Sequence, residues 1–108
     1  MAEMMTTGTW VVDEGKQAAF LAAWAGFAEW ASTMDGAGRL LLGRDTGDPN
    51  RFVSFGAWAS PELVHSWKAD PDFRERMAQV LQYVDDFRPS ELDVVASADR
   101  GLTMPVSP

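Results

Sequence analysis

The only histidine of this 108-residue chain, His65, lies two residues before Trp67 in the segment "SPELVHSWKADPDF". Imidazole is the side chain that titrates nearest neutral pH, so His65 is a candidate proton acceptor. Trp67 shares the apolar side of the expected short helix with Leu63, whereas His65 points away from that side at about 100° per residue. A histidine on the polar side of a helix is also typical of a solvated residue, and Trp67 can pack against a sheet or line a ligand pocket. The segment is consistent with a general base beside an aromatic ligand pocket, and also with a short helix that only packs against the core.

The chain lacks the side chains and motifs that several other kinds of catalysis require. The chain has no cysteine and one histidine, which excludes thiolate nucleophiles, zinc ribbons and multi-histidine metal sites. It has no glycine-rich phosphate loop before a helix and no nucleophile elbow. Hydrolase, kinase and dehydrogenase chemistry therefore have no support, and we expect neither a metal nor a cofactor.

The charge balance limits the partners. A formal net charge of −7 opposes binding to phosphate backbones and to anionic lipid. The most apolar run, "AAFLAAWAGFA" from Ala18, is too short to span a bilayer and lacks the pattern of a signal peptide. We expect a cytoplasmic protein that binds neither nucleic acid nor membranes.

Hydrophobic periodicity predicts the elements that must position these residues. β-branched and aromatic runs predict strands, and apolar residues three and four positions apart predict helices. Ser60–Pro61 and Asp70–Pro71 each supply an N-cap followed by proline at the first helical position. The expected elements are strands over 7–12, 39–44, 51–58 and 91–96, a first helix that ends at Gly36 or Gly38, a short helix after Ser60, and a longer helix from Phe73 through Phe87 that Arg88 and Pro89 close.

The order β-α-β-β-α-β predicts an α+β, ferredoxin-like plait with a four-stranded antiparallel sheet and helices on one face. We expect one domain over 1–108, with a core over about 7–96 and a loose tail over 97–108.

The second face of this sheet needs a cover. Along "RFVSFGAW" one alternating set contains Val53 and Phe55, and the other contains Phe52 and Trp58, so both faces are largely apolar. A solvated face would carry polar residues at every second position. Because the helices cover one face only, we predict that a second copy covers the other, giving a homodimer closed into a dimeric α+β barrel.

The segment "FGAWASPELVHSWKADPDF", with its strand ending in Trp58 and Phe73 opening the longer helix, resembles the antibiotic biosynthesis monooxygenase family. The resemblance extends from Thr7 to about Ala96 in element order and lengths. It implies oxidation of aromatic polyketides or quinols by molecular oxygen without metal or flavin, and a branch of the family binds and degrades haem.

The resemblance also assigns site residues. Trp67 takes the place of a pocket tryptophan, Leu63 stands where such members have asparagine, and Phe73 stands where they have tyrosine. Arg88 corresponds to an arginine near the end of the long helix, and Met77 occupies the position of the haem-branch histidine, where a methionine on an apolar stripe is more often core.

Three functions follow from these observations. The leading one is a cofactor-free monooxygenase that acts on a planar aromatic molecule, with His65 and Arg88 as catalytic candidates. The residues expected to contact its substrate are Trp67, Leu63, Phe73, Trp24, Phe27 and Met77. The alternative is a non-catalytic small-molecule-binding or dimerisation module, and the third is haem binding or degradation.

Overall fold

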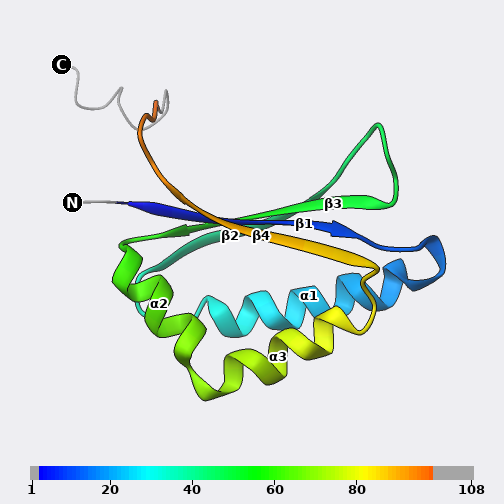
Figure 1. Cartoon of the computed structure of the whole chain (residues 1–108), viewed down its shortest axis with the longest axis horizontal. Coiled ribbons are helices and arrows are strands. Elements are labelled where there is room, and N and C mark those ends of the chain that lie inside the picture. The colour runs from blue at the N-terminus through cyan, green and yellow to red at the C-terminus, as the bar shows by residue number, and fades with distance from the viewer. Residues whose placement is uncertain (1–2, 99–108) are drawn as a thin grey trace.

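The computed structural model describes residues 3–98 as a four-stranded antiparallel sheet with helices on one face (Figure 1). The predicted tail falls mostly on residues 99–108, which lie outside the described residues. The elements in chain order are β1 (Met4–Val11), the 3-10 turn η1 (Glu14–Lys16), α1 (Gln17–Ala31), β2 (Ala37–Arg44), β3 (Arg51–Trp58), α2 (Pro61–Ala69), α3 (Pro71–Leu81) and β4 (Asp86–Asp93).

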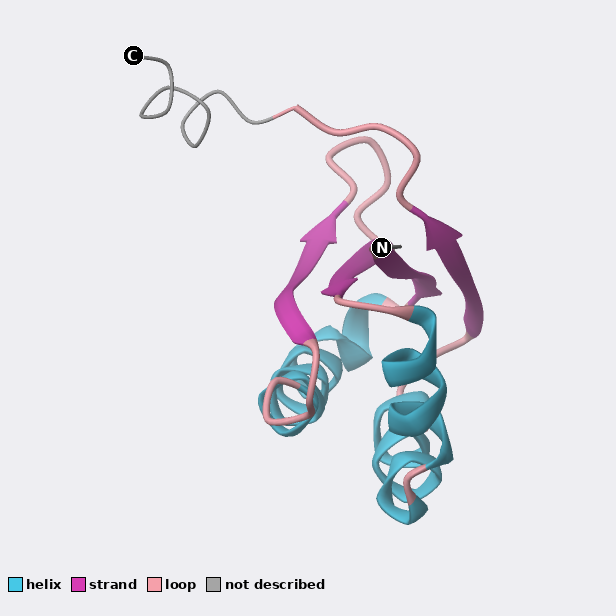
Figure 2. Cartoon of the chain, turned by 90° about the vertical axis from the view of Figure 1, so that its left-hand side faces the viewer, coloured by secondary structure: helices cyan, strands magenta, loops and turns pink. Residues whose placement is uncertain are grey.

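The strands lie in the order β2-β3-β1-β4, so β1 and β3 are central and β2 and β4 are edges. Each neighbouring pair is antiparallel. The helices all lie beneath one face of the sheet, and Figure 2 shows α1 on one side with α2 and α3 on the other. The predicted α+β, ferredoxin-like plait is therefore confirmed.

Local capping signals set the helix starts as predicted. The Ser60 side chain accepts a hydrogen bond from the backbone N–H of Leu63, and the Asp70 carboxylate accepts one from the backbone N–H of Asp72. Each satisfies a backbone donor that the first helical turn leaves unpaired. Gly36, one of the two predicted terminators, adopts a positive φ of 81°, but in the turn before β2 and not at the end of α1.

The segment from Phe87 to Pro89 departs from the sequence prediction, which placed it at the end of the second long helix. That helix, α3, ends at Leu81, and all three residues belong to β4. Phe87 stacks on Trp10 of the neighbouring strand, with ring centroids 4.0 Å apart. Pro89 is tolerated because β4 is an edge strand with only one neighbour. The first strand also begins earlier than predicted, at Met4.

The core lies between the sheet and the helices. Phe20 of α1 is fully buried and its ring lies 5.1 Å from that of Phe52 on β3 and 5.5 Å from that of Trp10 on β1. Tilted aromatic contacts of this kind add to the free energy gained from burying the rings. This cluster fixes the start of α1 against the two central strands.

The opposite face of the sheet carries no helix within residues 3–98 (Figure 1). Its register places Leu41, Phe55 and Leu92 there, on three different strands, and their exposed fractions are 46%, 44% and 46%. A patch of large apolar side chains across a sheet is unusual for a surface that faces water.

Phe20→Ala should lower the free energy of unfolding by about 3–5 kcal/mol because it empties a fully buried ring position. Leu21→Ala, at the next and 39% exposed position, is the matched control and should cost under about 1.5 kcal/mol. Urea unfolding followed by tryptophan fluorescence measures both. Equal losses in the two variants would contradict this description of the core.

Candidate functional site

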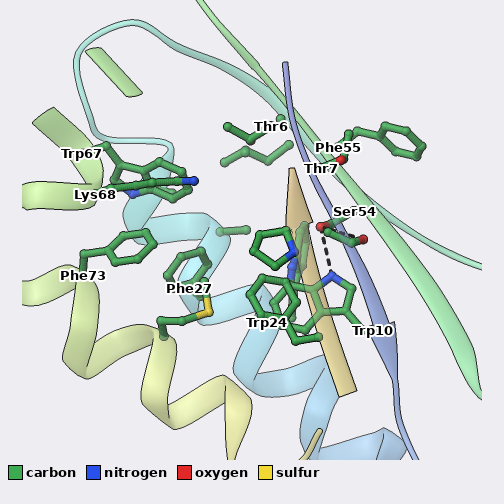
Figure 3. A pocket seen from close by; sticks show the side chains of 18 residues that line it. Thr6, Thr7, Trp10, Trp24, Phe27, Ser54, Phe55, Trp67, Lys68 and Phe73 are labelled. Atoms are coloured by element: carbon green, nitrogen blue, oxygen red, sulfur yellow. Dashed lines mark hydrogen bonds between the residues drawn. The ribbon is translucent and has the colours of Figure 1, made fainter. Parts of the chain in front are cut away.

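A cavity of about 170 Å³ lies between the sheet and the three helices (Figure 3). The central strands β1 and β3 form its floor, α1 forms one wall, and α2 and α3 form the other. An engineered apolar cavity of about 150 Å³ is large enough to hold benzene. The space is therefore large enough for an aromatic ring.

Two glycines of the central strands are closely surrounded by neighbouring side chains. A Cβ on Gly8 would lie 2.8 Å from Cε1 of Phe87, and one on Gly56 would lie 2.7 Å from Oγ1 of Thr6. Real Cβ atoms do not approach other atoms so closely. A Cβ at either position would displace side chains that border the cavity, so glycine leaves room for those side chains.

Aromatic side chains close one end of the cavity. Trp67 of α2 stacks on Trp58 at 4.5 Å between ring centroids and meets the edge of Phe73 at 5.0 Å and 89°. Phe27 of α1 reaches the same cluster, 5.8 Å from Trp67. The Trp67 indole Nε1 is buried and has no hydrogen-bond partner within residues 3–98. Leaving such a donor unpaired costs about 1–3 kcal/mol.

The other end is bordered by Trp10 and Phe87. Trp10 is buried, and its Nε1–H donates to the hydroxyl oxygen of Ser54 at 3.0 Å (Figure 3). On β3 the next side chain, Phe55, points away from the cavity toward the uncovered face of the sheet (Figure 3).

The structure brings together five of the six residues for which ligand contact was predicted. They all line the cavity: Trp24, Phe27, Trp67, Phe73 and Met77. Ligand contact by these five remains a prediction. The sixth, Leu63, is outside the lining, because its side chain lies against Gly36 in the turn before β2.

The two catalytic candidates do not reach the cavity. The side chain of His65 is 70% exposed, and its Nε2 lies 3.8 Å from a carboxylate oxygen of Glu91. Arg88 is opposite Thr9 in the sheet, and its 80% exposed side chain pairs with Asp86. The predicted position of Arg88 at a helix end is wrong, and neither side chain lines the cavity.

Among residues 3–98, Lys68 is the only charged residue in the lining. Its Nζ donates to a carboxylate oxygen of Glu91 at 2.7 Å, which ties α2 to the edge strand β4. This hydrogen bond lowers the pKa of Glu91 below that of a free glutamate, with smaller contributions from the charges of Lys68 and His65. A cation therefore lies at the border of an otherwise uncharged space.

Three lining residues were not predicted from the sequence: Lys68 and the polar floor residues Thr6 and Ser54. Thr6 lies just before the predicted first strand. Which residues of β1 lie beside which residues of β3 depends on the register between the two strands, and this register is not evident from either strand alone. A usable signal exists in the sequence, because "TTGTW" over 6–10 and "SFGAW" over 54–58 share the spacing hydroxyl-x-Gly-x-Trp.

Within the described residues, no three histidine, aspartate or glutamate side chains come close enough to hold a metal ion together. Among the helices of residues 3–98, none is long and apolar enough to cross a membrane.

The model of one protein family, antibiotic biosynthesis monooxygenase, matches residues 4–79. The chain belongs to this family. The match covers β1 through most of α3 and hence most of the cavity lining. No curated protein matches the chain in sequence.

Solved structures share the fold of this antibiotic biosynthesis monooxygenase family member at low sequence identity. SnoaB, a cofactor-independent oxygenase from Streptomyces nogalater, superimposes in a mutant form with a TM-score of 0.81 at 17% identity, over 88% of this chain and 95% of that one. A Deinococcus radiodurans protein named for the same family gives 0.79 at 16%, over 89% and 96% of the two chains. A conserved Methanosarcina mazei protein gives 0.77 at 12%, over 85% and 92%.

The pKa of Glu91 should rise toward the ordinary glutamate value in Lys68→Met, because the main hydrogen bond to its carboxylate is lost. Since the folded-state pKa is lowered, this pair stabilises the fold above the unfolded pKa of Glu91, and the contribution is lost as the pH falls through the lowered value. NMR titration of the side-chain carboxyl carbons measures the shift.

Asp45 is the internal control for that titration. Its pKa is lowered mainly by the backbone N–H of Gly47 and then by Arg51, so it should be the same in both proteins. An unchanged Glu91 pKa in Lys68→Met would contradict the assignment of this contact.

Proposed function

We propose that this protein binds a planar aromatic metabolite of the polyketide or quinol type in the cavity between sheet and helices, and oxidises it with molecular oxygen and no cofactor. The observation that carries the proposal is an aromatic cavity of about 170 Å³ with a single charged side chain at its border. Membership of the antibiotic biosynthesis monooxygenase family and the fold shared with the cofactor-independent oxygenase SnoaB support it.

The chemistry needs little from the protein because the substrate supplies the electrons. An anthrone-type methylene loses a proton to give an electron-rich anion, which reduces O2. One oxygen atom then forms a C=O bond at that carbon, and the other leaves as water with the two hydrogens of the methylene. The protein's part is to exclude water, orient the ring and stabilise the anion.

One charged group suits these tasks. The ammonium of Lys68 stabilises negative charge that develops on a substrate oxygen, more strongly in an apolar site than in water. The catalytic roles predicted for His65 and Arg88 stay predictions, and their exposed positions give no support to them.

A non-catalytic binding module is the second candidate. The observation that favours it is that lysine is the only titratable residue in the lining, so no carboxylate or imidazole is at hand to take the substrate proton. Quenching of tryptophan fluorescence by a ligand, without oxygen uptake from an anthrone, distinguishes this candidate from the oxygenase.

A homodimer is part of the proposal. The exposed side chains of Leu41, Phe55 and Leu92 form an apolar patch on the uncovered face of the sheet. A second copy laid on this face buries the patch on both subunits and leaves each cavity on the outer, helix-covered side. The cytoplasmic location remains a prediction from the sequence.

Ala28→Trp should abolish both ligand binding and oxygen uptake, because Ala28 lines the cavity and the new indole would fill it. We expect at least a tenfold loss of affinity for an anthrone, measured by fluorescence titration alongside an oxygen electrode. The matched control is Ala25→Trp, at an exposed position of the same helix outside the lining. Equal activity of the two variants would refute the cavity as the site.

Phe55→Lys should convert the dimer to a monomer by placing a charge in the centre of the apolar patch. Size-exclusion chromatography with light scattering should give twice the 11.9 kDa subunit mass for the wild type and the subunit mass for the variant. Leu81→Lys, on the helical side and 37% exposed, should stay dimeric. A monomeric wild type at micromolar concentration would rule out this assembly.

A further inference from the structure

The floor of the cavity contains a repeated arrangement on its two central strands. β1 carries Thr6, Gly8 and Trp10, and β3 carries Ser54, Gly56 and Trp58, each in the spacing hydroxyl-x-Gly-x-Trp. The antiparallel register pairs Thr6 with Gly56 and Ser54 with Gly8, so a local two-fold axis relates the two segments.

Each tryptophan donates to the hydroxyl of the other strand. Trp10 Nε1–H reaches Ser54 Oγ at 3.0 Å, and Trp58 Nε1–H reaches Thr6 Oγ1 at 3.2 Å. A hydroxyl that accepts from an indole still has one hydrogen to donate. The two indoles therefore fix the oxygen atoms and leave both hydroxyl hydrogens for another acceptor.

The protein itself provides few hydrogen-bond acceptors for these two hydroxyl hydrogens. Ser54 Oγ lies 3.5 Å from the carbonyl oxygen of Gly8, at the outer limit of a hydrogen bond, and no acceptor for the Thr6 hydroxyl is present within residues 3–98. Both side chains line the cavity. An unsatisfied hydroxyl beside an apolar space is costly, and a ligand acceptor removes that cost.

We propose that Thr6 and Ser54 determine ligand specificity by donating hydrogen bonds to two oxygen atoms on a flat ring system held in the cavity. The inference rests on the proposed function, since it assumes an aromatic ligand in this cavity. Thr6 and Ser54 occupy diagonal positions, whose Cα atoms are about 7–8 Å apart in such a pair. A flat ring that carries two oxygen atoms, as in a quinone or its hydroquinone anion, matches two donors on adjacent strands of one sheet face.

The test compares 1,4-naphthoquinone with naphthalene, which has the same rings without the oxygens. The chain has no cysteine that the quinone could alkylate. Dissociation constants come from titration calorimetry on the wild type, Ser54→Ala and Thr6→Val. Loss of one donor should weaken naphthoquinone binding roughly five- to tenfold and leave naphthalene binding unchanged within about twofold.

Matched variants separate ligand recognition from structural support. Thr9→Val makes the same change on β1, on the face of the sheet away from the cavity, and should affect neither ligand. Ser54→Thr and Thr6→Ser keep the hydroxyl and should keep naphthoquinone affinity within about twofold of the wild type. If Thr6→Val does not fold, Ser54→Ala together with these conservative variants decides.

The outcomes are distinct. If the wild type binds both probes and Ser54→Ala and Thr6→Val weaken both equally, the hydroxyls only support the tryptophans and this inference is wrong, while the cavity remains a binding site. If neither probe binds the wild type, the proposed function itself is wrong, and with it the inference that rests on it.

Discussion

The absence of side-chain volume at Gly8 and Gly56 is the constraint on which the site depends. These glycines lie on the helix-covered face of the two central strands, where any Cβ would clash with Phe87, Thr6 or Leu40. Elsewhere on that face large rings fill the space, as Trp10, Phe52 and Trp58 do at 1–2% exposure. Gly8 and Gly56 leave room on this face for the side chains that border the cavity, and aromatic clusters close its two ends.

The same arrangement accounts for the division of the molecule into two functional faces. On the covered face, stacked aromatics hold α1, α2 and α3 off the sheet and leave room for a ring. On the other face, Leu41, Phe55 and Leu92 provide an apolar surface suited to a second copy. Because successive strand residues point to opposite faces, "SFGAW" serves both, with Phe55 outward and its neighbours Ser54 and Gly56 inward.

Local sequence signals predicted much of the fold. The caps at Ser60 and Asp70, followed by proline, are visible without tertiary structure, and the structure confirms both. The end of α3 was not predictable in the same way, because Val80, Val84 and Phe87 continue the three- and four-residue spacing past Leu81. Stacking of Phe87 on Trp10 decides between helix and strand there, and that contact depends on tertiary pairing.

The site shows the same limit. Phe27, Trp67 and Met77 were accessible from helical periodicity and from the family resemblance, and all three line the cavity. The hydroxyls of Thr6 and Ser54 become neighbours only through the register of β1 with β3, 48 positions apart in the sequence (54 − 6). His65 stood out in the sequence because it is unique, and uniqueness says nothing about where a side chain points.

The most direct test of a ligand site in the cavity is the indole N–H region of the NMR spectrum, where the five tryptophans report separately. On titration with 1,4-naphthoquinone, the signals of Trp10 and Trp24, which line the cavity, should shift in a saturable manner. The signal of Trp30, which lies outside the lining and packs under Arg76, should not. Saturable shifts confined to Trp30, or no shifts at all, would contradict the account.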